Sequence, residues 1–170
     1  MTTILITPEY IAWESCLTFG GQRHINAEPK VVVNDFGLWA GAGAPDICDK
    51  AMRVLCSDED VDLTEVPGFV EAAQRAGGFE LARVWRDAYG DLAVQWWSDT
   101  NLYGFVPPLP LALGSGSSFV LGAYYASGRD VPLAIQLAAE HDEGSSGPVF
   151  VKSTNAMLDE VDHLKKRKYT

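Results

Sequence analysis

Short segments rich in β-branched and aromatic residues, separated by tight turns, constrain the fold of this chain most strongly. Segments of this kind predict β-strands, and a tight turn between two of them predicts an antiparallel hairpin. The predicted strands cover residues 2–7, 10–16, 30–33, 36–40, 79–85, 91–97, 102–106 and 148–152. Residues 17–29 alternate poorly between apolar and polar side chains, and predict a loop or an irregular strand.

Helical segments lie between groups of these strands and after the last strand. They cover residues 45–55, 67–76, 117–126, 131–141 and 157–166. Pro45 and Pro132 fit the first turn of a helix, and either Ser117 or Ser118 is predicted to cap the third helix. The order of strands, helices, strands, helices and a final strand predicts an α+β fold, in which helices flank two antiparallel sheets.

The length of 170 residues fits one domain with a sizeable core. We place this domain at residues 1–153 and expect residues 154–170 to form its C-terminal helix and basic tail. The run from Lys165 to Lys168 is predicted to be solvated. Cys48 and Cys56 stand at helical spacing among small and apolar residues, which predicts core packing of reduced thiols.

Charge and hydropathy exclude several classes of function. The formal net charge of -10 argues against nucleic-acid binding, which needs clustered Lys and Arg. An apolar run near the roughly 20 residues of a membrane span is missing from the sequence, as is a secretion signal. We therefore expect a cytoplasmic protein. The three histidines are scattered and predict no metal site.

Four separated motifs follow one another along the chain. The first is Met1-Thr2-Thr3-Ile4, and the second joins the segment 11–15, the Gly20-Gly21 pair and Lys30-Val31. The third is the segment 113–117, Leu-Gly-Ser-Gly-Ser, and the fourth is the segment 142–149, Asp-Glu-Gly-Ser-Ser-Gly-Pro-Val. In this order and at these separations, the motifs resemble the proteasome β-subunit family of N-terminal nucleophile hydrolases, which includes the HslV-type peptidases and phage-encoded relatives.

The resemblance implies a four-layer αββα sandwich and a threonine peptidase. Thr2 takes the place of the nucleophile, and its own α-amine is the base once Met1 is removed. A free α-amine has a pKa of about 7.7 to 8.0, so it can accept a hydroxyl proton at neutral pH. Hydrolysis by this route requires no cofactor, and the small side chain of Thr2 favours removal of Met1.

Five further side chains match the supporting positions of the family. Lys30 matches the lysine beside the nucleophile, whose charge stabilises developing negative charge. Glu14 falls where the family has an aspartate that positions this lysine, so it departs from the family by one methylene. Three polar residues match those that hold the amine and tune its protonation: Ser115, Asp142 and Ser145.

The oxyanion hole of such an enzyme uses a backbone N–H in a glycine-containing turn. Gly41 and Gly43 compete for this role, and the spacing to Asp46 favours neither cleanly; we choose Gly43. The resemblance further implies a homo-oligomeric ring, a separate ATP-dependent unfoldase as a partner, and peptides or unfolded proteins as substrates.

Two other functions fit the same residues. A catalytically inactive, proteasome-like ring or interaction protein is favoured by Glu14 and would be the outcome if Met1 were retained. An amidohydrolase that acts on a small amide would use the same nucleophile in a closed pocket. Among the three, the threonine peptidase is the expected function.

Overall fold

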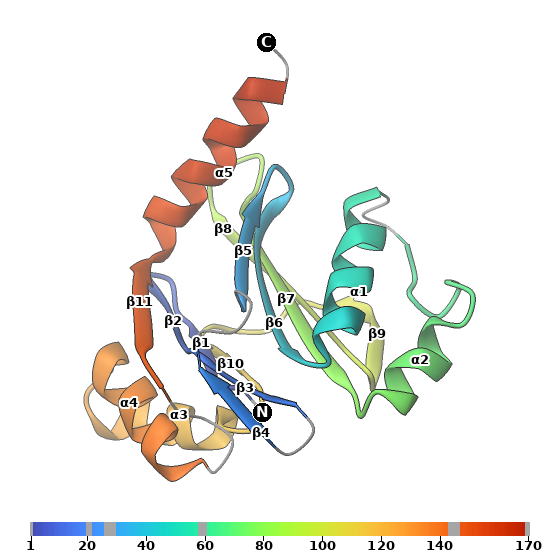
Figure 1. Ribbon diagram of the computed structural model, residues 1–170. Helices are drawn as coiled ribbons and strands as arrows, with labels where there is room; N and C mark the ends of the chain where they lie inside the picture. Colours follow the sequence, from blue (N-terminus) through green and yellow to red (C-terminus); the bar gives the residue numbers. More distant parts are fainter. Residues whose placement is uncertain (1, 20–21, 26–29, 58–60, 143–146, 169–170) are drawn as a thin grey trace. The chain divides into compact units, whose positions relative to one another are not determined.

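A computed structural model of the protein describes residues 2–19, 22–25, 30–57, 61–142 and 147–168. The chain forms two compact units (Figure 1). The first contains residues 1–30 and 108–159, and the second contains residues 31–107 and 160–170. The single domain expected from the sequence stays a prediction.

The first unit is built on a four-stranded antiparallel sheet in the order β10-β1-β2-β11. Its strands are β1 (Ile4–Ile6), β2 (Tyr10–Glu14), β10 (Leu111–Leu113) and β11 (Val149–Ser153). Ile4 pairs with Leu113 on one side and with Trp13 on the other, and Val149 pairs with Glu14. A separate hairpin of β3 (Cys16–Phe19) and β4 (Gln22–Ile25) belongs to the same unit.

Two helices, α3 (Ser117–Ala126) and α4 (Val131–His141), pack side by side against the four-stranded sheet (Figure 1). Asp130 caps α4, since its side chain accepts a hydrogen bond from the N–H of Leu133 at 3.0 Å. Alternate residues of the strands, such as Leu5 and Ala12, bury against Val120 and neighbouring helical side chains. This apolar layer fixes which face of each strand the helices cover.

The second unit contains a five-stranded antiparallel sheet in the order β5-β6-β7-β8-β9. Its strands are β5 (Val31–Asn34), β6 (Gly37–Gly43), β7 (Phe79–Arg86), β8 (Leu92–Ser98) and β9 (Asn101–Phe105). Its helices are α1 (Pro45–Ser57) and α2 (Phe69–Arg75). Ile47, Ala51 and Leu55 recur every four residues on α1 and bury one face of it in an apolar cluster with Trp39 and Trp97.

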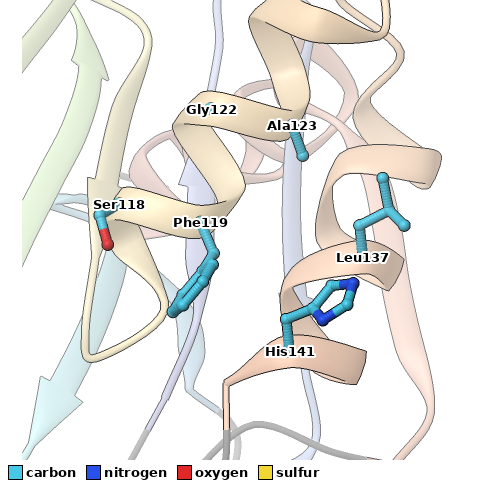
Figure 2. A pocket seen from close by; sticks show the side chains of 6 residues that line it. All are labelled: Ser118, Phe119, Gly122, Ala123, Leu137 and His141. Carbon is cyan, nitrogen blue, oxygen red and sulfur yellow. The ribbon is translucent and has the colours of Figure 1, made fainter.

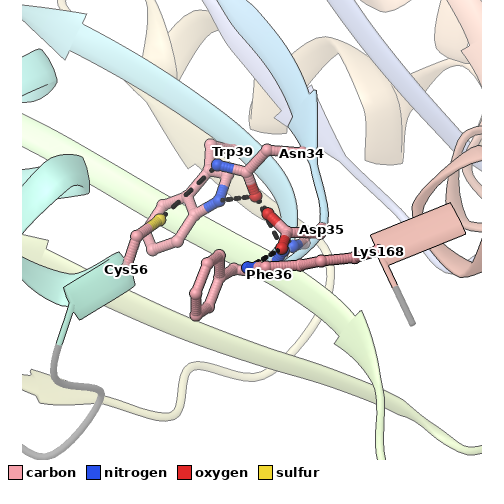
Figure 3. Close-up of polar contacts among 7 residues, drawn as sticks. Asn34, Asp35, Phe36, Trp39, Cys56 and Lys168 are labelled. Atoms are coloured by element: carbon pink, nitrogen blue, oxygen red, sulfur yellow. Dashed lines mark hydrogen bonds and ion pairs between the residues drawn. The ribbon is translucent and has the colours of Figure 1, made fainter. Parts of the chain in front are cut away.

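The turn between β5 and β6 is held by one amide side chain (Figure 3). The Asn34 Oδ1 accepts hydrogen bonds from the N–H groups of Phe36 and Gly37 at 2.9 and 3.1 Å, and from the Trp39 Nε1 at 3.0 Å. The Lys168 ammonium pairs with Asp35 in the same turn at 2.5 Å and lies over the Phe36 ring. The turn predicted at residues 34–35 is therefore confirmed, with its cause.

The α+β class is confirmed, with two antiparallel sheets and helices packed against each. Several details differ from the sequence prediction. The predicted strand 10–16 breaks at Ser15, and part of the predicted loop 17–29 is the hairpin of β3 and β4. The final helix α5 (Thr154–Lys168) is longer than predicted at both ends, so the run from Lys165 to Lys168 is its last turn and not a tail.

The cap predicted for α3 is wrong. Gly116 is the N-cap residue, and α3 has no side-chain cap hydrogen bond from it. The reason is steric, because the segment before α3 packs against the start of β1 too closely for a side chain at this position.

Candidate active site

The candidate site lies at one end of the four-stranded sheet, where strands that run in opposite directions bring distant segments together. Because β1 is antiparallel to both of its neighbours, residues before Ile4 lie beside the segment after Leu113 and beside the end of β2. The segment that precedes β11 reaches the same end, since Val149 pairs with Glu14. The register thus gathers Thr2, Glu14 and Ser115.

The first residues of the chain are held on both sides. Thr2 is 3% exposed and Thr3 is fully buried. On one side, the Thr3 N–H donates to the Glu14 Oε1 at 3.0 Å, and the Glu14 N–H donates to the Thr3 carbonyl at 3.3 Å. On the other side, the backbone of Thr2 lies against Gly114. Thr2 is therefore fixed between the end of β2 and the segment that follows β10.

Glu14 and Lys30 form a buried ion pair. The Glu14 side chain is fully buried and that of Lys30 is 7% exposed. The Lys30 ammonium donates to the Glu14 Oε1, the same oxygen that accepts the Thr3 N–H. The longer glutamate side chain thus reaches both partners. The ammonium of Lys30 is tied, through one oxygen atom, to the residue that follows Thr2.

Ser115 and Asp142 form a second polar pair. The Ser115 hydroxyl donates to the Asp142 Oδ2 at 2.7 Å. Asp142 is the C-cap residue of α4, and its N–H donates to the Ala138 carbonyl, which fixes its backbone at the end of the helix. Ser115 lies between β10 and α3, next to Gly114. The two residues are far apart in the sequence, and the helix packing brings them together.

Two predicted positions do not belong to the described part of the first unit. Ser145 lies outside the described residues. Gly43 belongs to the second unit, where it ends β6 with a φ of 89°. A Cβ at Gly43 would come within 2.7 Å of the Gly78 carbonyl oxygen, so the backbone itself requires glycine there. A Cβ at Gly41 would touch Cys48 at 3.3 Å. The oxyanion role of Gly43 stays a prediction.

Ser15 is a buried hydroxyl beside this cluster that sequence reasoning did not single out. It follows Glu14 directly, and its N–H donates to the Pro148 carbonyl at 3.1 Å. The hydroxyl oxygen is buried and has no hydrogen-bond partner among the residues that the structure describes. A buried hydroxyl of this kind is uncommon and draws attention to this end of the sheet.

An apolar groove of about 330 Å³ lies between α3 and α4 (Figure 2). Phe119 and Ala123 of α3 face Leu137 and His141 of α4 across it. Its lining shares no residue with the Thr2, Glu14 and Ser115 cluster. His141 directly precedes Asp142, so this groove and the Ser115–Asp142 pair are neighbours along the chain.

In the described part of the chain, no three His, Cys, Asp or Glu side chains are grouped so that they could hold a metal ion. No described helix is long and apolar enough to cross a membrane.

Comparison with known proteins yields a likeness of fold. Neither the known family models nor the curated proteins match this chain. Among solved structures, Thiobacillus denitrificans BPH is similar with a TM-score of 0.54 and 16% identity, over 90% of this chain and 97% of that one. The same protein in complex with epoxomicin is similar with a TM-score of 0.53 and 17% identity, over 90% of this chain and 98% of that one.

Sequence reasoning missed the structural partners of the nucleophile candidate. In the sequence, Thr3 looks like an ordinary strand residue. In the structure, its N–H donates a hydrogen bond to the Glu14 carboxylate. Gly114 and Gly116 stood in a motif typical of loops, and the contacts that require glycine at these positions depend on the pairing of β1 with β10. The glycines on both sides of Ser115 were the one feature of the sequence that could have indicated such close packing.

Proposed function

We propose that the protein is a threonine-type peptidase with Thr2 as the nucleophile. After removal of Met1, the α-amine of Thr2 takes the proton of its own hydroxyl, and the oxygen attacks the carbonyl carbon of a peptide bond. The amine part of the substrate leaves with a proton, and an ester joins the acyl part to Thr2. Water then cleaves this ester and regenerates the hydroxyl.

The observation that carries this proposal is the buried pair of Glu14 and Lys30 beside the first residues of the chain. A buried ion pair contributes little to stability compared with apolar residues of the same shape. Its presence at the end of the sheet is therefore better explained by an electrostatic role at Thr2. The Lys30 ammonium would stabilise negative charge that develops on the Thr2 oxygen.

The remaining residues have supporting roles in the proposal. Ser115 and Asp142 would hold the α-amine of Thr2 in position, together with Ser145. A backbone N–H at Gly43 would stabilise the oxyanion. The chemistry needs no cofactor. We further propose a homo-oligomeric ring in the cytoplasm that acts on peptides or unfolded proteins, with a separate ATP-dependent unfoldase as a partner; nucleic acid and membrane are not expected partners.

Intact mass after incubation with a peptide epoxyketone tests the proposal. Epoxomicin is a suitable probe, because a protein of similar fold forms a complex with it. We expect loss of Met1 and one adduct on the wild-type protein, and no adduct on a Thr2→Ala variant. A wild-type protein that retains Met1 and forms no adduct would refute the peptidase.

A specific observation favours the inactive ring or interaction protein as a second candidate. Thr2 is 3% exposed, and a peptide carbonyl has to reach its hydroxyl. Removal of Met1 would have to open this position for the peptidase to act. Absence of the epoxomicin adduct in the experiment above, together with a particle of ring size in light scattering, would favour the inactive protein.

A further inference from the structure

Two glycines enclose the first residues of the chain from the side opposite Glu14. A Cβ built on Gly116 would lie 1.9 Å from the Thr3 Oγ1, and 3.1 and 3.2 Å from the Thr3 Cβ and Cγ2. A Cβ built on Gly114 would lie 1.9 Å from the Thr2 carbonyl oxygen. Both distances are far below van der Waals contact, so neither position has room for a methyl group.

Glycine is required at position 116 for steric reasons only, and not for its backbone conformation. Its φ of -84° and ψ of 6° are open to any residue, whereas Gly114 has a φ of 89° that favours glycine by itself. Gly122, in the same helix α3, provides the contrast, since a Cβ there would meet nothing within 4 Å. A methyl group at Gly116 therefore isolates the steric effect, and one at Gly122 is its matched control.

Thr3 has little freedom to retreat from such a methyl group. Its N–H and carbonyl are both hydrogen-bonded to Glu14 on the other side, in the register that continues β1. Ordinary contact begins at 3.4 Å, so the Thr3 Oγ1 would have to move by about 1.5 Å and the Thr3 Cβ by about 0.3 Å. The hydroxyl can move by rotation of the buried side chain, whereas the Cβ moves only if the Thr3 backbone shifts away from Gly116 or the start of α3 shifts.

We infer that Gly116 is a positioning residue for the nucleophile, which acts through Thr3. The inference rests on the proposed function of Thr2 and adds the element that sets the place of Thr2. The absent side chain at Gly116 lets Thr3 lie flat against the start of α3, while Glu14 holds it from the other side. A displacement of about 1 Å near a reacting group can cost about 100-fold in rate.

The test compares four variants of the full chain: Gly116→Ala, Thr3→Ala, the double variant, and Gly122→Ala. The rate of adduct formation with epoxomicin is separated into the affinity of the first complex and the rate of the covalent step. We expect Gly116→Ala to slow the covalent step about 100-fold, with the affinity changed less than about threefold. Gly122→Ala should react at the wild-type rate.

The double variant provides the decisive rescue. Thr3→Ala removes the Oγ1 and Cγ2 atoms, which lie 1.9 and 3.2 Å from the new methyl group, and leaves a Cβ contact at 3.1 Å that small shifts can absorb. We expect Gly116→Ala to slow the covalent step by less than about tenfold in the Thr3→Ala background. The midpoint of thermal unfolding should likewise fall less on Gly116→Ala in the Thr3→Ala background than in the wild type. This measurement reports the contact independently of the reaction.

The outcomes separate this inference from the proposed function. A wild-type rate for Gly116→Ala, or a double variant as slow as Gly116→Ala, would overturn the positioning role while Thr2 remained the nucleophile. If Gly116→Ala unfolds, recovery of folding and rate by the double variant supports the steric pair, and no recovery overturns it. A wild-type protein that forms no adduct removes the proposed function, and this role for Gly116 with it.

Discussion

The two units bury charged side chains with different partners. In the second unit, the buried guanidinium of Arg83 donates through Nε and Nη2 to the Phe36 carbonyl at 3.0 and 2.7 Å, and it lies over the Trp85 ring at 4.7 Å. In the first unit, the buried carboxylate of Glu14 holds the Lys30 ammonium and the Thr3 N–H through a single oxygen. Arg83 supports a turn, whereas Glu14 and Lys30 support the start of the chain.

The two kinds of partner allow a structural role to be separated from a catalytic one by experiment. Arg83 donates to the carbonyl of Phe36, a partly buried turn residue, and its guanidinium lies over the rings of Trp39 and Trp85. The Glu14–Lys30 pair brings two charges into the interior, and in proteins the replacement of a buried ion pair by apolar residues of similar volume is often neutral for stability. A stability measurement alone cannot distinguish the two sites, but stability and activity together can.

The largest effect is expected for Glu14→Gln. The substitution leaves the Lys30 ammonium buried without this carboxylate, which costs about 3 to 5 kcal/mol of unfolding free energy. Activity should fall at least about 100-fold, because the ammonium loses its fixed position. Urea unfolding and the rate of adduct formation measure the two effects.

A double variant, Glu14→Gln with Lys30→Met, sharpens this comparison. Removing both charges should restore most of the unfolding free energy while activity stays low. If the double variant were active, the pair would be structural, as Arg83 is. If it stayed as unstable as Glu14→Gln, the ion pair would be needed by the fold.

A smaller effect is expected for Arg83→Met. Met fills much of the same volume, so the main loss is the pair of hydrogen bonds to the Phe36 carbonyl, which costs about 1.5 to 3 kcal/mol. The rate of adduct formation at Thr2 should stay within about twofold of the wild type. Arg83→Lys, which keeps a charged donor, is the control and should lose less stability. An Arg83→Met protein that folds normally but no longer reacts would break the comparison.

The last prediction concerns the Cys48 thiol of the second unit, whose reactivity is suppressed by burial. Burial, with the nearby Asp46 carboxylate as a lesser cause, raises the pKa of the Cys48 thiol from 9.0 to about 12. The raised pKa lowers its thiolate fraction at pH 8 about a thousandfold, and the higher reactivity of a more basic thiolate recovers part of this. We expect alkylation by iodoacetamide at least about 30-fold slower in the folded protein than in urea.

Peptide mapping by mass spectrometry assigns this alkylation to Cys48. The rate in the folded protein should rise with pH up to and beyond pH 10, because the thiolate fraction keeps growing below the raised pKa. A rate that levels off near pH 9 would mean that Cys48 has the ordinary thiol pKa and that its surroundings do not suppress it.

Most helices and hairpins were predictable because their signals are local. Pro45 and the spacing of Ile47, Ala51 and Leu55 specify α1 within a few turns of chain. The hairpin of β3 and β4 was missed, since residues 16–25 lack the alternation that a half-buried strand shows. The cap of α3 was missed for a different reason, because the contact that requires Gly116 comes from Thr3, more than a hundred residues away.

Motifs in the sequence are sufficient to name Thr2, Glu14, Lys30, Ser115 and Asp142 as candidate site residues. That one oxygen of Glu14 accepts from both Lys30 and Thr3, and that Ser115 donates to Asp142, follows only from the three-dimensional fold. Motifs record which side chains are present, whereas atomic contacts between distant segments depend on strand register and helix packing, which are set by the whole core.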